Sequence, residues 1–211
     1  MGKHIFTSQT IKEDERMNAT TITIGEARLS YVHLFEPYAS QQGQAPKYSV
    51  TVLLPKSNTK AKAQLDEAIE AARQAGLQNK WNGQAPAILA TTIHDGDGVK
   101  QNGEAYGPEC AGHWVLNCNA NPDHPPKVVN TLRQPVIDQS EIYSGIYGWV
   151  NINFFPYFNA GKKGIGCGLN AVMKTRDGEP LGGSAPSVDE AFASVPQQPQ
   201  IDPITGLPIP M

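Results

Sequence analysis

Aromatic side chains recur at alternate positions in SGIYGWVNINFFPYFNAGKKGIGCGLNAVMKTRDGEPLGG, residues 144–183. Alternate residues of a β-strand point to the same face, so two rows are expected. One row is apolar and is predicted to be core: Ile146, Gly148, Val150, Ile152 and Phe154. The other row mixes rings with amides: Tyr147, Trp149, Asn151, Asn153, Phe155 and Tyr157. Exposed rings of this kind can stack on the bases of single-stranded nucleic acid.

A second strand is predicted at 164–174, after a turn that presents Lys162 and Lys163. Its expected core row is Ile165, Cys167, Leu169, Ala171 and Met173. The opposite row begins with three glycines and continues through Asn170, Val172 and Lys174. A hairpin of the two strands would set the rings beside a flat glycine strip, where a base or a backbone can approach closely. The alternative is that the helix or another strand covers the aromatic row.

Cations are expected to track the phosphates beside these rings. We therefore predict a nucleic-acid site made of Tyr147, Trp149, Phe155, Tyr157, Lys162, Lys163, Lys174, Lys127 and Arg133.

Three other motifs are weaker candidates for chemistry. HDGDG offers His94, Asp95 and Asp97 to a divalent metal, as in a nuclease, but such strings more often form turns. The spacing of Cys110, His113, Cys118 and His124 faintly resembles a zinc knuckle, yet strand alternation places His113 and Cys118 on opposite faces. GIGCG lies inside a strand pattern, whereas a dinucleotide fingerprint must open a helix. We predict no metal, no cofactor and no catalytic residue.

The composition indicates a β-rich globular protein. The chain has 211 residues, with 20 glycines and 17 prolines. The net charge is −3, but the three acids after residue 183 account for it, so residues 1–183 are neutral and any basic surface must arise locally. Three cysteines without a secretory signal favour reduced thiols in a cytosol, and no apolar run is long enough to span a bilayer.

The order of the expected elements is several strands, one helix, and more strands. Strands are predicted within 20–35, 47–55 and 113–120, and short extended pieces at KVVN and PVID. The helix is predicted at 57–76, capped by Ser57 or Asn58 and ended by Gly76. Its apolar stripe is Ala61, Leu65, Ile69 and Ala72. This order fits a Greek-key barrel with one helical insertion at 18–183, between a weakly structured leader at 1–17 and a disordered, proline-rich tail at 184–211.

The chain resembles a family of bacteriophage single-stranded DNA-binding proteins with an OB-fold. The resemblance covers most of residues 20–183 and rests on the order of ARLSYVHLFEP, HDGDG, AGHWVLNCNA, PPKVV, SEIYSG and GKKGIGCGLNAVMKTRDGEPLGG. It implies a decorated OB barrel, sequence-tolerant binding of single strands, a role in phage DNA replication or recombination in the host bacterial cytoplasm, and no catalysis. The first alternative is a β-rich phage structural protein whose aromatic face binds protein. The tail departs from strongly acidic tails of such proteins, and its apolar end, LPIPM, is a candidate docking peptide for another replication protein.

Overall fold

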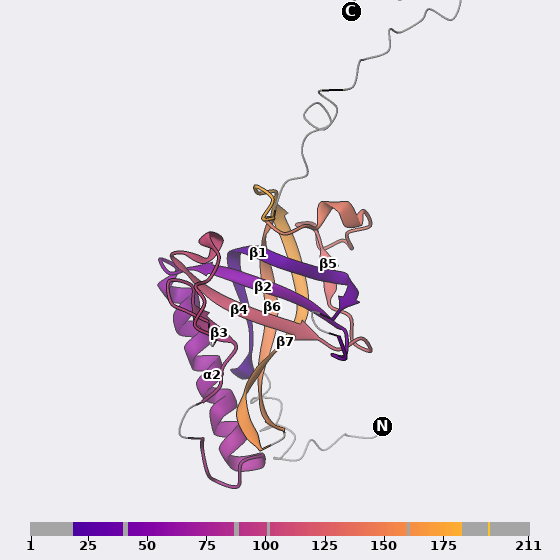
Figure 1. The fold of residues 1–211 in the computed structure, drawn as a ribbon. Helices are drawn as coiled ribbons and strands as arrows, with labels where there is room; N and C mark the ends of the chain where they lie inside the picture. Colours follow the sequence, from indigo (N-terminus) through magenta and orange to yellow (C-terminus); the bar gives the residue numbers. More distant parts are fainter. Residues whose placement is uncertain are drawn as a thin grey trace, which may run out of the picture. The chain divides into compact units, whose positions relative to one another are not determined.

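The computed structural model describes residues 19–39, 42–86, 89–100, 102–159, 161–182 and 194. The elements, in chain order, are β1 (Thr21–Tyr38), β2 (Lys47–Pro55), α2 (Thr59–Asn79), β3 (Ile93–Asp95), the 3-10 helix η1 (Pro108–Cys110), β4 (His113–Ala120), β5 (Lys127–Val129), the 3-10 helix η2 (Gln139–Glu141), β6 (Tyr147–Asn159) and β7 (Lys162–Arg176) (Figure 1). The predicted leader and nearly all of the predicted tail lie outside the described residues. No helix in the described part is long and apolar enough to cross a membrane.

Five strands close into a barrel. β1 pairs with β6 through its first half and with β2 through its second half, while β2 pairs with β4 and β6 pairs with β7, all antiparallel. The ring closes where β4 meets β7 in parallel, with Asn119 opposite Gly168. β3 extends the sheet from β4, and β5 extends it from β7. The predicted mainly β OB barrel with one inserted helix is confirmed.

The apolar rows of the strands fill the barrel. The predicted core row of β6 is buried throughout, and it meets Ile24 and Leu29 of β1, Val52 of β2 and Leu116 of β4, each at most 1% exposed. Burying each such side chain stabilises the fold by roughly 1.5–3 kcal/mol relative to exposure. The opposite rows of these strands therefore form the outer surface of the barrel.

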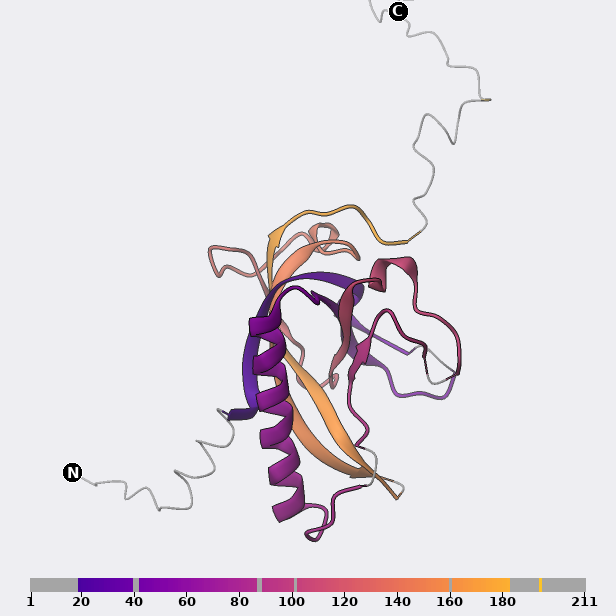
Figure 2. The same ribbon diagram turned by 90° about the vertical axis from the view of Figure 1, so that its left-hand side faces the viewer.

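Helix α2 lies alongside the β6–β7 hairpin and covers one open side of the core (Figure 2). Asn58 caps it, as predicted, because its side-chain oxygen accepts from the Ala61 amide at 3.1 Å. The helix does not end at Gly76 but continues to Asn79. Gly76 is instead where the buried Trp81 ring packs, since a Cβ there would lie 2.8 Å from that ring.

The predicted alternation of β7 is wrong beyond Asn170. Asn151 pairs with Ala171 and Ile152 pairs with Leu169, so Asn170 is an extra residue in a β-bulge. After the bulge Val172 and Lys174 lie opposite Val150 and Gly148, on the core side. Ala171 and Met173, predicted as core, lie instead opposite Asn151 and Trp149 on the outer side.

Candidate nucleic-acid interface

Phe155 and Tyr157 lie on the outer surface of the β6–β7 hairpin, and neither helix nor strand covers them completely. Phe155 is 43% exposed and Tyr157 is half-buried. Register places Phe155 opposite Gly166 and Tyr157 opposite Gly164. The outward position predicted for these two rings is thus present.

The glycines of β7, predicted as a flat strip for a ligand, are instead in contact with side chains of β6. A Cβ on Gly166 would lie 2.6 Å from the Phe155 ring, and one on Gly164 would lie 2.5 Å from the Tyr157 hydroxyl. The strip is therefore covered by the rings of the neighbouring strand and is not an open floor for bases. The glycines let the rings lie flat across the hairpin, which leaves the outer ring faces for a ligand.

Tyr147 and Trp149 occupy a different part of the outer surface, toward β1. Trp149 is 39% exposed and lies against Gly25, where a Cβ would be 2.8 Å from the indole. The Arg176 guanidinium lies 3.4 Å from the centre of the Tyr147 ring. The predicted aromatic row is therefore divided: Phe155 and Tyr157 at one end, Trp149 and Tyr147 at the other, with the two amides between them.

The two lysines of the turn point to opposite sides of the hairpin. Lys162 pairs with Asn159 on the outer side and is exposed. Lys163 pairs with Phe158 on the other side, and its ammonium donates to the carbonyls of Gln84 at 2.9 Å and Trp81 at 3.3 Å. Lys162 is therefore the one lysine of this turn that lies on the side of the rings, because Lys163 binds the turn that follows α2.

The remaining predicted cations also separate. Lys174 lies on the core side after the bulge, where it is 2.8 Å from Asp177 and its side chain is only 13% exposed. Lys127 is exposed opposite Ala171, on the outer side of β5. Arg133 lies in the turn that follows β5, exposed, with a φ of 61°.

A cleft of about 570 Å³ lies between the hairpin and the end of β4 and will be called the hairpin cleft. Phe155, Tyr157 and Asn153 form one wall, and Asn119, Asn121 and His124 form the other. Asn170, the bulge residue, lines it too, and its amide donates to Asn151 at 2.9 Å. Amides and rings in one cleft suit bases, which offer both hydrogen-bonding edges and flat faces.

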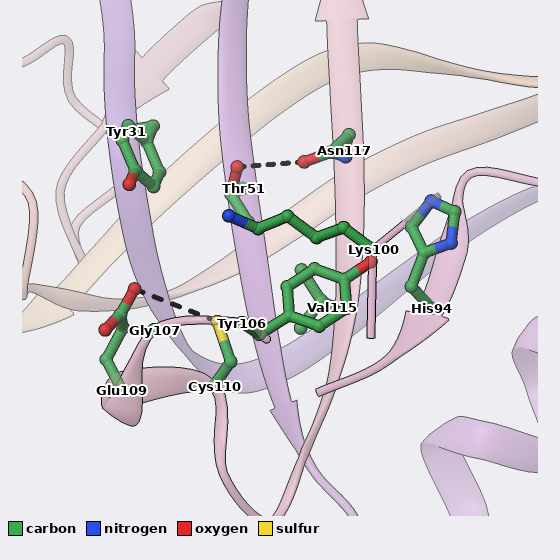
Figure 3. Close-up of a pocket in the computed structure, with 10 residues that line it drawn as sticks. All are labelled: Tyr31, Thr51, His94, Lys100, Tyr106, Gly107, Glu109, Cys110, Val115 and Asn117. Atoms are coloured by element: carbon green, nitrogen blue, oxygen red, sulfur yellow. Dashed lines mark hydrogen bonds between the residues drawn. The ribbon is translucent and has the colours of Figure 1, made fainter. Parts of the chain in front are cut away.

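A second cleft, of about 460 Å³, lies over the outer face of β1, β2 and β4 and will be called the tyrosine cleft (Figure 3). Its floor is Thr51 and Asn117, which are hydrogen-bonded at 3.0 Å. The segment after β3 forms its wall with Lys100 and Tyr106, whose ammonium and ring centre are 5.9 Å apart. His94 also lines the cleft, and burial lowers its pKa, so it is uncharged at neutral pH.

Tyr31 lies on the side of the tyrosine cleft opposite Lys100 and Tyr106 (Figure 3). It lies in a bulge of β1, between Ser30 opposite Thr51 and His33 opposite Ser49. Its φ is 47° and the residue is 66% exposed. Left-handed backbone costs a tyrosine free energy, and a ring that lies mostly in solvent returns little packing, so the position favours a role in binding.

The two clefts belong to one groove across the outer surface. Between them lies a small pocket lined by Tyr38, Lys47, Ser49 and Asn119. Lys47 and Asn119 line the hairpin cleft as well, and Ser49 and Asn119 are two residues along their strands from Thr51 and Asn117. Two residues of strand span about 7 Å, so the three hollows are neighbours along the same face, and together they will be called the groove.

Lysines surround this groove although residues 1–183 are neutral as a whole. Lys47 and Lys100 line it, and Lys162 lies at its rim by register with Asn159. Lys127 lies farther out, opposite Ala171, the residue that follows Asn170 of the hairpin cleft. Among the described residues that line the three hollows, one has a carboxylate, Glu109. Local arrangement thus provides the basic surface that the charge totals do not.

Sequence reasoning missed the tyrosine cleft. Tyr31, Thr51, Tyr106 and Asn117 come from four separate segments, so no local pattern unites them. A weak signal was present in β2 and β4, whose outward rows include Ser49, Thr51, Asn117 and Asn119.

The HDGDG string forms a turn that Lys56 holds. The Lys56 ammonium donates to carboxylates of both Asp95 and Asp97, the latter at 2.7 Å, and Asp95 accepts from the Asp97 amide at 2.9 Å. These hydrogen bonds lower the pKa of both carboxyl groups, with the bond from Lys56 as the largest cause. No group of three potential metal ligands occurs among the described residues.

Comparisons with known proteins identify the family and the fold. The profile of a family described as Enterobacter phage Enc34, ssDNA-binding protein, matches residues 20–201. The solved single-stranded DNA-binding protein of bacteriophage Enc34 in complex with ssDNA is 33% identical, with a TM-score of 0.64 over 77% of this chain and 90% of that one. Protein p50 of Acyrthosiphon pisum secondary endosymbiont phage 1 is 30% identical over 80% of this chain and 91% of its own length. The gp2.5 protein of bacteriophage T7, at 17% identity and a TM-score of 0.51, shares the fold.

Proposed function

We propose that this chain, which belongs to the family of the phage Enc34 single-stranded DNA-binding protein, binds single-stranded DNA in the groove that joins the tyrosine cleft to the hairpin cleft. It holds the strand by stacking and by phosphate contacts, without catalysis. The Enc34 protein was solved in complex with ssDNA, and the same ligand suits the groove described above. The observation that supports the proposal is that exposed rings, amides and lysines occur together along three neighbouring hollows on one face.

The strand would meet aromatic platforms at both ends of the groove. Tyr31 and Tyr106 offer ring faces at one end, and Phe155 and Tyr157 offer them at the other. Each stacked base contributes roughly 1–3 kcal/mol, and stacking tolerates any base because every base has a flat face. The amides between the platforms give hydrogen bonds that can adapt to different edges.

The lysines would follow the phosphates. Each neutralised phosphate steepens the dependence of log K on log salt by about 0.7 for a single strand. If Lys47, Lys100, Lys127 and Lys162 each meet one phosphate, the slope is about −3. Lys163 and Lys174 are already bonded within the protein, so they contribute least.

Tyr147, Trp149 and Arg133 belong to a proposed extension of the path beyond the groove. A strand that leaves the hairpin cleft and continues over the outer face of β6 would meet Trp149. The extension is needed only for oligonucleotides longer than the groove. We further propose that the protein serves phage DNA replication or recombination in the host cytoplasm.

The direct test is titration of a fluorescently labelled oligonucleotide with the full chain over a salt series. We expect binding that is stronger for a single strand than for a duplex of the same length, with a slope near −3. Absence of binding at low salt would favour the other candidate function, a protein-binding role for the same rings. No change in an oligonucleotide after incubation with Mg²⁺ is expected, and cleavage abolished by a chelator would contradict the non-enzymatic assignment.

A further inference from the structure

Two buried thiols face each other at the point where the barrel closes. The Sγ atoms of Cys118 on β4 and Cys167 on β7 are 3.4 Å apart, and neither residue is disulfide-bonded. Cys118 is fully buried and Cys167 is 4% exposed. The sequence pattern places Cys167 in a core row and gives it no partner, and the fold supplies one.

The β4–β7 pairing that closes the barrel will be called the seam, and its register makes the two cysteines direct neighbours. Asn119 lies opposite Gly168 in a parallel pair, so the residues before them, Cys118 and Cys167, are also adjacent. Neighbouring strands are about 4.8 Å apart, which falls within the range of Cα separations seen in disulfides, about 4.4–6.8 Å. The sulfur atoms therefore need to approach, but the backbones do not need to rearrange.

The seam is also the thinnest joint of the barrel. β4 and β7 share one residue pair there, whereas every other neighbouring pair in the ring shares a ladder of several. A covalent bond at this joint would close a loop between two cysteines that are 49 positions apart in the sequence. Such a bond restricts the unfolded chain and raises thermal stability when the native geometry accepts it.

The two thiols of the pair differ in their access to solvent. Cys167 is among the residues that line the hairpin cleft and is 4% exposed, whereas Cys118 is fully buried. The hydrogen bond with Cys167, together with burial, raises the pKa of the Cys118 thiol. Cys118 is also fully buried, so an external reagent is not expected to react with it first. The third thiol, Cys110, packs with Leu53 and Val115, lines the tyrosine cleft and is 6% exposed. Its Sγ lies 3.8 Å from a Glu109 carboxylate oxygen and is not paired with another thiol.

We propose that Cys118 and Cys167 are a redox-modifiable pair that forms an intramolecular disulfide across the β4–β7 seam when the protein meets a small disulfide oxidant. The Cys167 thiolate attacks one sulfur of the oxidant RSSR, forms a mixed disulfide and releases one thiolate RS⁻. The Cys118 thiolate then attacks Cys167 Sγ and releases the second RS⁻. The two thiol protons go to the two released thiolates, so two cysteines and RSSR give one protein disulfide and two RSH. The bond staples the barrel closed and fixes the floor of the groove.

The test treats the native full chain with cystamine and follows its intact mass, its melting temperature and its disulfide-linked peptides without reduction. We expect a loss of two hydrogen atoms, one peptide pair joining Cys118 to Cys167, a higher melting temperature, and full reversal by dithiothreitol. C110S should behave as the parent does. C118S should stop at the mixed disulfide on Cys167 and show no rise in melting temperature.

Three results would overturn the proposal. One is a native protein that gains no disulfide although the same chain forms one when unfolded. Another is stable modification of Cys110 while Cys167 stays unmodified, because both thiols line the groove and the proposal requires Cys167 to react. The third is a disulfide between Cys118 and Cys167 that lowers the melting temperature, because the link would then distort the seam instead of stapling it. The test needs no nucleic acid, so its failure and the failure of the proposed function are separate outcomes.

Discussion

Replacing Tyr31 with glycine should weaken DNA binding and stabilise the fold at the same time. Tyr31 holds a φ of 47° in the β1 bulge, a conformation that glycine adopts without a steric penalty. Its ring is 66% exposed, so truncation removes little packing. Opposite signs for binding and stability are expected only where a strained residue is kept for its contact with a ligand.

The two magnitudes can be estimated separately. Left-handed backbone costs a non-glycine residue about 1–2 kcal/mol, and glycine gives back about 0.5–1 kcal/mol in chain entropy, which leaves a net gain of about 1 kcal/mol. For a domain of this size that gain raises the melting temperature by about 2–4 °C. Loss of one stacked base costs about 1–3 kcal/mol, which is about 5-fold to 150-fold in Kd.

Tyr31→Ala is the matched control, because it removes the same ring but keeps a Cβ at the strained position. Both variants should lose the same affinity in anisotropy titrations, whereas only Tyr31→Gly should gain stability in thermal unfolding. Equal Kd values for Tyr31→Gly and the parent would refute the assignment of Tyr31 to the binding surface. A glycine variant less stable than the alanine variant would refute the strain estimate.

Four further expectations test other parts of the account. Lys162→Ala should make the slope of log K against log salt shallower by about 0.7. Lys163→Met should leave that slope unchanged and lower the melting temperature, because the Lys163 ammonium donates to two carbonyls. Equal slopes for the two variants would contradict this division. Gly166→Ala should displace the Phe155 ring and weaken binding, and it should add nothing in a Phe155→Ala background; an additive loss would show that the glycine acts independently of the ring. Trp149→Ala should weaken the binding of long oligonucleotides and spare short ones, so an equal effect at all lengths would place Trp149 in the main site. Hydrogen bonds from Arg73 and Gln74 lower the pKa of Glu70 from 4.5 to about 2, so the carboxylate stabilises the fold fully above pH 4.5 and less as the pH falls toward 2. Glu70→Gln should therefore lose less stability in acid than the parent when urea unfolding is followed against pH. Identical pH profiles would exclude this contribution.

The parts of the fold that follow from short-range patterns could be predicted. The apolar row of β6 is buried as expected, and Asn58 caps the helix as its side chain allows. The helix boundary at Gly76 was wrong because the glycine accommodates Trp81, a contact that depends on how the chain returns after the helix. A glycine in a helical pattern marks either an end or a close approach, and only the packing distinguishes the two.

The arrangement of the site was harder to predict. Period-2 alternation breaks at Asn170, because one extra residue in a strand moves every later side chain to the other face. Lys174 was assigned to the wrong side for this reason. The tyrosine cleft depends on strand pairing between distant segments, which no single stretch of sequence encodes.

The central claim is that single-stranded DNA lies in the groove between the tyrosine cleft and the hairpin cleft. Photocrosslinking tests it most directly: a short oligonucleotide with 4-thiothymidine at successive positions is irradiated with the full chain, and the crosslinked residues are mapped by mass spectrometry. We expect crosslinks to Tyr31 and Tyr106 from one end of the oligonucleotide and to Phe155 and Tyr157 from the other. Crosslinks from a short oligonucleotide confined to Trp149 and Tyr147, or to helix α2, would contradict the claim.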